Sequence, residues 1–195
     1  YVQHLLEGIN NRQLKGMIYE DFWRINDVAE QAMGILTSTA SRFNIPVRDH
    51  ASAQELAMMI FLDYPEAFDY AWALYSYYHS SCRISQHWMG NDGFSLDEVK
   101  LRDFESQMKA FFSAQARGRE CLVNFYDDGD QAAIAVIHGS YIRAIARWEG
   151  REVKIDHFVP AYEDILLYDK RRYLLSIKAT LDKDREQYIR CFASA

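Results

Sequence analysis

The pattern of apolar and polar positions has a helical period over the first part of the chain and a strand period after residue 118. Over residues 19–43, apolar side chains recur every three or four positions, which predicts one long amphipathic helix. Ser52 and Glu55 have the spacing of a capping box and predict the start of a second helix. Pro65 suits the first turn of a third helix, which we expect to continue to about Cys82.

The predicted third helix is apolar on two sides. One side carries Phe68 and Tyr75, and the other carries Tyr70, Leu74 and Tyr77. A helix of this kind either lies between two layers or exposes an aromatic strip. Because tyrosine is enriched where protein interfaces exclude water, we expect Tyr70, Leu74 and Tyr77 to form an interface. Burial of the same strip in the core is the alternative.

The second part of the chain predicts a sheet. A second capping box at residues 95–98 predicts a helix that ends near Gly118. Six segments rich in β-branched and aromatic residues follow, separated by short turns: Cys121–Tyr126, Gln131–Ile137, Tyr141–Trp148, Glu152–Phe158, Ile165–Tyr168 and Tyr173–Ile177. Strands joined by short turns are antiparallel. We therefore expect a twisted antiparallel meander of five or six strands, with helices on one face.

The predicted fold class is α+β. An N-terminal helical part covers residues 1–118, the antiparallel sheet covers 119–180, and a closing helix covers 181–195. We expect these parts to pack as one unit, because the helices carry more apolar faces than they can bury among themselves. The chain starts with Tyr1 rather than Met, as a fragment of a longer chain does.

Composition narrows the functional classes. The 195 residues carry a net charge of −6, and 49% of them are hydrophobic, which is enough for a substantial core. The negative charge argues against broad binding of duplex nucleic acid, which depends on clustered Lys and Arg. The sequence has no apolar run long enough to span a membrane. Three scattered cysteines do not make a disulfide framework, so a cytoplasmic location is expected.

One set of residues has the spacing of a catalytic centre. Asp128 lies at a predicted strand end, and Glu152 and Lys154 are alternate residues of a later strand, so their side chains share a face. An Asp with a Glu-x-Lys set is typical of metal-dependent nucleases and phosphodiesterases, where carboxylates hold Mg²⁺. Glu98 and Lys100 repeat the spacing inside a predicted helix. We therefore favour the alternative of a solvated turn and a polar strand face.

Basic residues suggest a second possible site. Arg143 and Arg147 lie on a predicted strand, and Arg171 and Arg172 lie in a predicted turn, with tyrosines interleaved. Such a surface is able to stack and neutralise a single-stranded nucleic acid. An ordinary solvated sheet face is the alternative, and the negative net charge favours it.

No metal site and no cofactor are predicted. His79, Cys82 and His87 lie in one segment, but no fourth ligand is near them in the sequence. A glycine-rich phosphate loop for a nucleotide is also missing from the sequence. His138 falls in a predicted turn, and no Ser or Cys stands at a spacing that suggests a nucleophile for it.

Two stretches resemble segments of bacterial proteins with no assigned activity. One is 48–71, which contains Leu62–Phe68, and the other is 160–179. The resemblance implies a bacterial cytoplasmic origin and transfers no functional residue. We therefore expect a non-catalytic interaction or regulatory domain that binds a protein partner or a second copy of itself. A metal-dependent nuclease or phosphodiesterase and a single-stranded nucleic-acid-binding module are the alternatives.

Overall fold

The computed structural model describes residues 9, 11–79, 81–90 and 98–194. These residues form six helices and seven strands, and the predicted α+β class is confirmed. The chain divides into two compact units, Tyr1–His79 and Ser80–Ala195. The packing of the whole chain as one unit stays a prediction. Among the described helices, none is long and apolar enough to cross a membrane.

The first unit is helical. Its helices are α2 (Arg12–Gln31), α3 (Met33–Arg42), α4 (Ala53–Asp63) and α5 (Pro65–Tyr78). Side chains from all of these helices share one core, whose most buried members include Val28, Leu36, Ala40, Leu56, Ile60, Phe68 and Ala71. Two contacts add to this core. Phe61 meets Phe68 edge to face at 5.1 Å, and Arg24 forms an ion pair with Asp69 at 3.2 Å.

The long helix predicted over residues 19–43 is two helices. Ala32 separates α2 from α3, with φ −140° and ψ 37°. Its side chain stays buried, as do those of Val28 and Leu36 on either side. The apolar stripe therefore continues through the break, which is why the periodicity does not reveal it. Met33, which belongs to the predicted stripe, is exposed.

The capping box predicted at the start of α4 is present. The hydroxyl of Ser52 accepts a hydrogen bond from the backbone N–H of Glu55 at 3.2 Å. The carboxylate of Glu55 accepts one from the backbone N–H of Ser52 at 2.8 Å. The Ser52 hydroxyl also donates to this carboxylate, at 2.9 Å, and the two hydrogen bonds that the carboxylate accepts from Ser52 lower the pKa of Glu55 because they favour its ionised form. The capping box predicted at residues 95–98 lies outside the described residues.

The second unit contains a five-stranded antiparallel sheet in the order β1-β7-β6-β3-β2. Its strands are β1 (Ile84–Trp88), β2 (Cys121–Asp128), β3 (Gln131–Gly139), β6 (Ala161–Asp169) and β7 (Leu174–Lys178). The sequence analysis did not predict β1. This strand pairs with β7 at the edge of the sheet, and its mostly polar residues give no strand signal.

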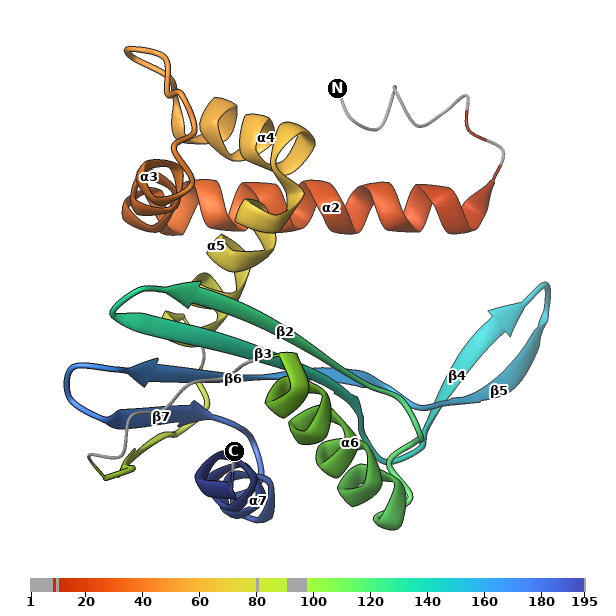
Figure 1. The fold of residues 1–195 in the computed structure, drawn as a ribbon. Helices are drawn as coiled ribbons and strands as arrows, with labels where there is room; N and C mark the ends of the chain where they lie inside the picture. Colours follow the sequence, from red (N-terminus) through yellow and green to blue (C-terminus); the bar gives the residue numbers. More distant parts are fainter. Residues whose placement is uncertain (1–8, 10, 80, 91–97, 195) are drawn as a thin grey trace. The chain divides into compact units, whose positions relative to one another are not determined.

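Two helices cover one face of this sheet, α6 (Glu98–Ala114) and the predicted closing helix α7 (Asp182–Ser194) (Figure 1). The helix α6, assigned by sequence to the helical part, thus belongs to the sheet unit. Alternate residues of the central strands meet both helices, as the strand period requires. The buried members of this core include Ile134, Val136, Leu166, Tyr168, Phe104, Phe112, Tyr188 and Phe192.

All six predicted strands are present, but they do not form one meander. The strands β4 (Arg143–Glu149) and β5 (Glu152–Phe158) pair only with each other, in a separate two-stranded sheet that we call the ribbon. The ladder between β3 and β6 runs from Gln131–Asp169 to Gly139–Ala161, so it leaves no place for the ribbon between these two strands. The ribbon projects away from the end of the sheet (Figure 1).

Removal of the cap at α4 tests the helical unit. We expect Ser52→Ala to lower the free energy of unfolding by about 1 kcal/mol, because the first turn of α4 loses its hydrogen-bond acceptor. Urea denaturation followed by circular dichroism measures this change.

The matched control is Ser38→Ala, in the middle of α3. The Ser38 hydroxyl donates only to the carbonyl oxygen of Ile35 within its own helix, so alanine is expected to be neutral or slightly stabilising there. Equal losses from both substitutions would contradict the role of Ser52 as a cap.

Candidate functional site

A group of buried charged and polar side chains lies at the end of the sheet from which the ribbon leaves. Its members come from every layer of the second unit: Arg117 from the segment after α6, His138 from β3, Asp164 from β6, and Asp184 and Tyr188 from α7. Each is at most 3% exposed. We call these five residues the root cluster. Groups of this kind are almost never buried without partners, so their contacts define what the site does.

The strand period places two members of the root cluster on the helix-covered face. On β3, the row Ala132, Ile134, Val136 ends with His138, and on β6 the row Tyr168, Leu166 ends with Asp164. The first predicted strand ends at Ile137, and the second begins at Ile165. Both strands are longer than predicted at this end, so His138 lies in a strand and not in a turn.

Arg117 holds the centre of the root cluster. Its Nη1 donates to both carboxylate oxygens of Asp184, at 2.7 and 2.8 Å, and its Nε donates to the carbonyl oxygen of Gly139 at 3.2 Å. The guanidinium also lies over the ring of Phe112, 4.7 Å from its centroid. These contacts tie α7 and β3 to the segment that follows α6. A buried ion pair of this kind is costly to break, because the remaining charge has no water around it.

His138 uses both ring nitrogens inside the cluster. Its Nε2 lies 2.9 Å from a carboxylate oxygen of Asp164, and its ring stacks on Phe112 at 4.1 Å between centroids. Its Nδ1 lies 2.9 Å from the carbonyl oxygen of Gly139 and 3.1 Å from Nη2 of Arg117. A protonated Nδ1 donates to the carbonyl oxygen, and an unprotonated Nδ1 accepts from the guanidinium. In either state the ring has partners on both sides and no nitrogen left for a nucleophile.

Tyr188 is a second hydrogen-bond partner of Asp164. Its hydroxyl donates to the same carboxylate oxygen at 2.9 Å. Burial raises the pKa of Tyr188 well above its ordinary value, and the negative charge of Asp164 raises it further. The phenol therefore stays neutral and acts as a hydrogen-bond donor.

The root cluster contains a set of metal-ligand types that the sequence did not suggest. One ligand atom each from His138, Asp164 and Asp184 lies within 4.8 Å of the others. Arg117, however, already bonds both oxygens of Asp184, and His138 and Tyr188 both bond Asp164. A cation at this point would have to displace the guanidinium, so the donor set does not fit a metal as well as it fits Arg117.

Cys121 of β2 lies beside the root cluster, because it pairs with His138 of β3 in the sheet. Burial raises the pKa of the Cys121 thiol to about 12, and the charge of Glu105 adds to the effect. A cysteine nucleophile needs a thiolate near neutral pH, which a nearby cation stabilises. Cys121 is therefore a buried structural residue and does not form a Cys–His catalytic pair.

Gly139 allows the backbone segments of the root cluster to approach closely. A Cβ atom at this position would lie 1.9 Å from the carbonyl oxygen of Arg117 and 2.9 Å from a methyl carbon of Val159. Only glycine leaves room for the segment after α6 to pass against the end of β3. Two backbone segments of the chain thus come into close contact at His138-Gly139. This dipeptide was predicted to form a turn.

Two cavities flank the start of the ribbon. One, of about 200 Å³, lies over the root cluster and is walled by Tyr141, Arg143 and Tyr162. The other, of about 300 Å³, is lined by Gly118, Ile137 and other residues of the adjoining segments. A third and larger pocket, of about 570 Å³, lies beside α4 in the helical unit, where apolar side chains dominate its lining.

The first leg of the ribbon is attached to the sheet unit by polar contacts on aromatic rings. Lys183 of α7 donates to the hydroxyl of Tyr141 at 2.5 Å, and Arg143 donates to the hydroxyl of Tyr162 at 2.7 Å. Each cation also lies within 6 Å of the ring that it contacts. These contacts secure the ribbon where it leaves the sheet, directly above the root cluster.

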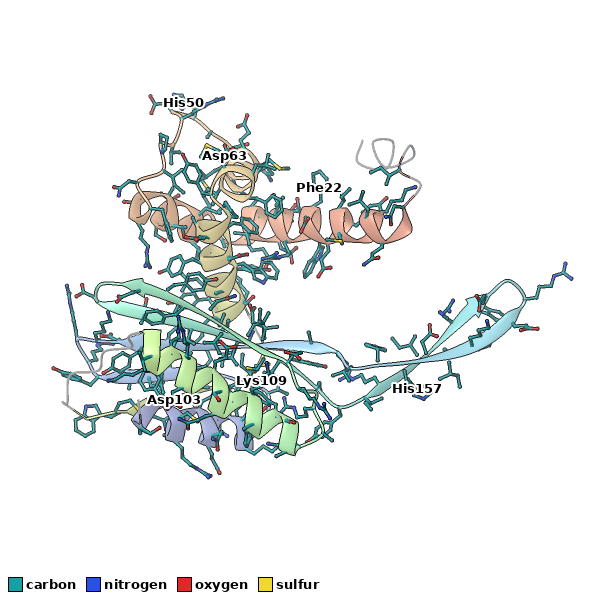
Figure 2. The ribbon with its side chains drawn as sticks, turned by 45° about the vertical axis from the view of Figure 1, so that its right-hand side comes forward. Phe22, His50, Asp63, Asp103, Lys109 and His157 are labelled. Atoms are coloured by element: carbon teal, nitrogen blue, oxygen red, sulfur yellow. The ribbon has the colours of Figure 1, made fainter. Side chains whose placement is uncertain are left out.

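Beyond this attachment the ribbon is exposed on both faces. Every residue from Tyr141 to Val159 is exposed. The register places Ala144, Ala146, Trp148, Val153, Ile155 and His157 on one face, which we call the apolar face. Trp148 is 74% exposed and Ile155 is 63% exposed. Side chains stand out on both sides of the ribbon in Figure 2, where His157 on β5 is labelled.

The opposite face of the ribbon is mostly polar, and four of its charged side chains form ion pairs. Arg147 forms ion pairs with Asp156 and Glu149, and Lys154 forms one with Glu149. This face also carries Ile145, which is 52% exposed.

The structure separates the residues of the predicted nuclease set. Glu152 and Lys154 lie on the polar face of the ribbon, and Lys154 pairs with Glu149. Asp128 ends β2 beside the β2–β3 turn, and its side chain lies outside the described part of the structure. The full length of β3 lies between that turn and the ribbon (Figure 1). The structure therefore does not bring these residues together around one ion.

The predicted nucleic-acid set is also divided. Arg143 and Arg147 lie on the ribbon, which leads into β6 at Ala161. Arg171 and Arg172 follow Asp169, at the opposite end of β6. The second pair bonds the turn itself, since both backbone N–H groups donate to a carboxylate oxygen of Asp169 at 3.0 Å. Acidic partners already contact Arg147 and Arg171.

The aromatic strip on α5 is buried in the single chain. The exposed fractions are 3% for Tyr70, 7% for Leu74 and 6% for Tyr77. The strip as an interface between proteins stays a prediction.

Comparison with known proteins gives no functional assignment. No model of a protein family matches the chain. A search of curated proteins finds no relative. The interpretation of the root cluster and the ribbon therefore depends on their geometry.

The ion pair in the root cluster makes a direct prediction. Arg117→Met leaves Asp184 buried without its cation, and we expect it to lower the free energy of unfolding by about 3–5 kcal/mol. The double variant Arg117→Met, Asp184→Leu removes both charges, so we expect it to be more stable than Arg117→Met alone. Urea denaturation of all four members of this cycle measures the coupling. Additive effects of the two substitutions would contradict the assigned pairing.

The close contact at Gly139 makes a second prediction. Gly139→Ala forces the backbone at Arg117 to move, and we expect a loss of more than about 2 kcal/mol in the free energy of unfolding. Gly34→Ala is the matched control, because nothing lies within 4 Å of a Cβ there and alanine favours the helix α3. If Gly139→Ala does not lower the midpoint temperature of thermal unfolding, the segment that contains Arg117 is not held against Gly139.

Proposed function

We propose that this chain is a non-catalytic interaction module of a bacterial cytoplasmic protein. The ribbon is its binding element, and the partner is another protein or a second copy of the chain. One observation carries the proposal. The segment from Tyr141 to Val159 is exposed throughout, yet it holds large apolar side chains at 40–74% exposure: Ile142, Ile145, Trp148, Val153, Ile155, Phe158 and Val159.

Physical chemistry makes this arrangement unusual for a surface without a function. A two-stranded ribbon is marginally stable in water, because it has no second layer to cover its apolar side chains. Scattered exposed apolar residues are ordinary on protein surfaces, but a contiguous patch marks an interaction site. The apolar residues of the ribbon are contiguous, since Trp148 pairs with Val153 and Ala146 pairs with Ile155 across the two strands.

The attachment of the ribbon supports the same proposal. The contacts of Tyr141 and Arg143 fix the first leg of the ribbon to the sheet unit, and the backbone N–H of Ser140 donates to the carbonyl oxygen of Pro160 in the second leg at 2.8 Å. A binding element that is held in position before it meets a partner loses less conformational entropy on binding. The network that sequence reasoning missed therefore has a clear physical role without any chemistry of its own.

The geometry favours an interaction module over the other two expectations. Lys154 and Arg147, which the nuclease and nucleic-acid hypotheses require, are already paired with acidic residues of the ribbon. His138 has partners at both ring nitrogens. The apolar face of the ribbon, in contrast, has no cover among the described residues of the second unit.

Photo-cross-linking tests the proposal. A benzophenone amino acid in place of Trp148 should form a cross-linked product with a protein in bacterial extract, because this side chain stands on the apolar face. The same amino acid in place of Val99 is the control, since Val99 of α6 is also 74% exposed but lies away from the ribbon. The proposal fails if the product at position 148 is no stronger than at position 99.

A further inference from the structure

We infer that the partner of the apolar face is a second copy of this chain, whose own apolar face packs against it across a two-fold axis. This inference rests on the proposed function and names its partner. The axis lies midway between the two ribbons and is perpendicular to their strands. It passes between the Ala146–Ile155 pair of one copy and the same pair of the other. The two ribbons then run in opposite directions, and the interface is isologous.

The side-chain sizes on β4 are self-complementary in this arrangement. Its apolar face reads small, small, large toward the tip, with Ala144, Ala146 and Trp148. Rotation about the stated axis reverses this order in the second copy. Trp148 of each copy therefore lies over the shallow surface at Ala144 of the other, while the two Ala146 residues face each other. A large indole over a methyl-lined surface is the type of packing that aromatic anchors make in stable interfaces.

The neighbouring strand fits the same axis. Ile155 pairs with Ala146 in the register, so the two Ile155 side chains meet on the axis. Val153 of each copy lies over His157 of the other. Two packed sheets stand about 10 Å apart, a gap that a pair of facing isoleucine side chains fills.

Charge favours a second copy over a charged partner. Among the described residues of the apolar face, His157 is the one titratable group. Four charged side chains of the polar face pair with one another: Arg147, Lys154, Glu149 and Asp156. Two copies therefore meet through surfaces without repulsion, whereas a nucleic acid or a strongly charged protein finds no counter-charge on this face.

The available area agrees with a modest dimer. The exposed apolar side chains of this face offer several hundred Å² per copy, so two copies bury on the order of 1,000 Å² in total, near the lower limit for a specific interface. We therefore expect a dimer that dissociates in the micromolar range.

The test is the solution mass of the purified full chain and two matched variants, measured by light scattering at about 100 µM, well above the expected dissociation constant. Ile155→Lys sets two positive charges against each other on the axis. Ile145→Lys makes the same change on the polar face, where Asp156 lies opposite in the register. We expect wild type and Ile145→Lys to have twice the 22.8 kDa mass of the chain, and Ile155→Lys to have the mass of one chain.

Circular dichroism first establishes that both variants are folded. If Ile155→Lys does not fold, Ile155→Cys replaces it. A bifunctional maleimide that spans about 10 Å should then join two copies of Ile155→Cys, and should not join two copies of Ile145→Cys. The inference is overturned if wild type has the mass of one chain, or if a folded Ile155→Lys remains a dimer.

The two levels of proposal fail separately. A monomeric wild type whose position 148 cross-links to a different protein in extract contradicts the second copy and leaves the interaction module in place. A monomeric wild type with no cross-link at position 148 contradicts both.

Discussion

The buried ion pair between Arg117 and Asp184 is the interaction on which the end of the second unit depends. The guanidinium bonds a helix, a strand end and an aromatic ring at once. Without it, Asp184 would be a buried charge with no counter-ion, and the segment after α6 would have no reason to pass so close to Gly139. The positions of His138 and Asp164 follow from the same packing, because their side chains complete the hydrogen bonds that the ion pair begins.

The second unit combines a rigid part with an exposed part. The helix-covered sheet buries its apolar side chains in the ordinary way and closes its polar end with a satisfied network. The ribbon does the opposite and presents apolar side chains to water. A molecule that covers this surface in the folded state stabilises the folded protein relative to the unfolded chain. The proposed function thus follows from the contrast between these two parts, and not from any single reactive group.

Much of the fold was predictable from local pattern, and the site was not. Alternation and turn residues gave all six strands from Cys121 onward, and β1 was missed because Ile84–Trp88 is short and mostly polar. The predicted strands stopped one residue before His138 and began one residue after Asp164, which hid both from the helix-covered face. Arg117 and Asp184 lie in segments that only tertiary packing brings together. The separation of the ribbon from the sheet was equally hidden, since the pairing of β3 with β6 is a non-local choice.

The ladder between β3 and β6 has a consequence for how this protein can change over evolution. Gly139 and Ala161 face each other in that ladder, so the whole ribbon enters and leaves the sheet at one point. A tight turn between these two residues would close the same ladder without the ribbon. Changes in the length or the surface of the ribbon therefore leave the register of the sheet unchanged. If the ribbon is the binding element that we propose, exchange of this one hairpin would change the binding specificity and leave the sheet as it is.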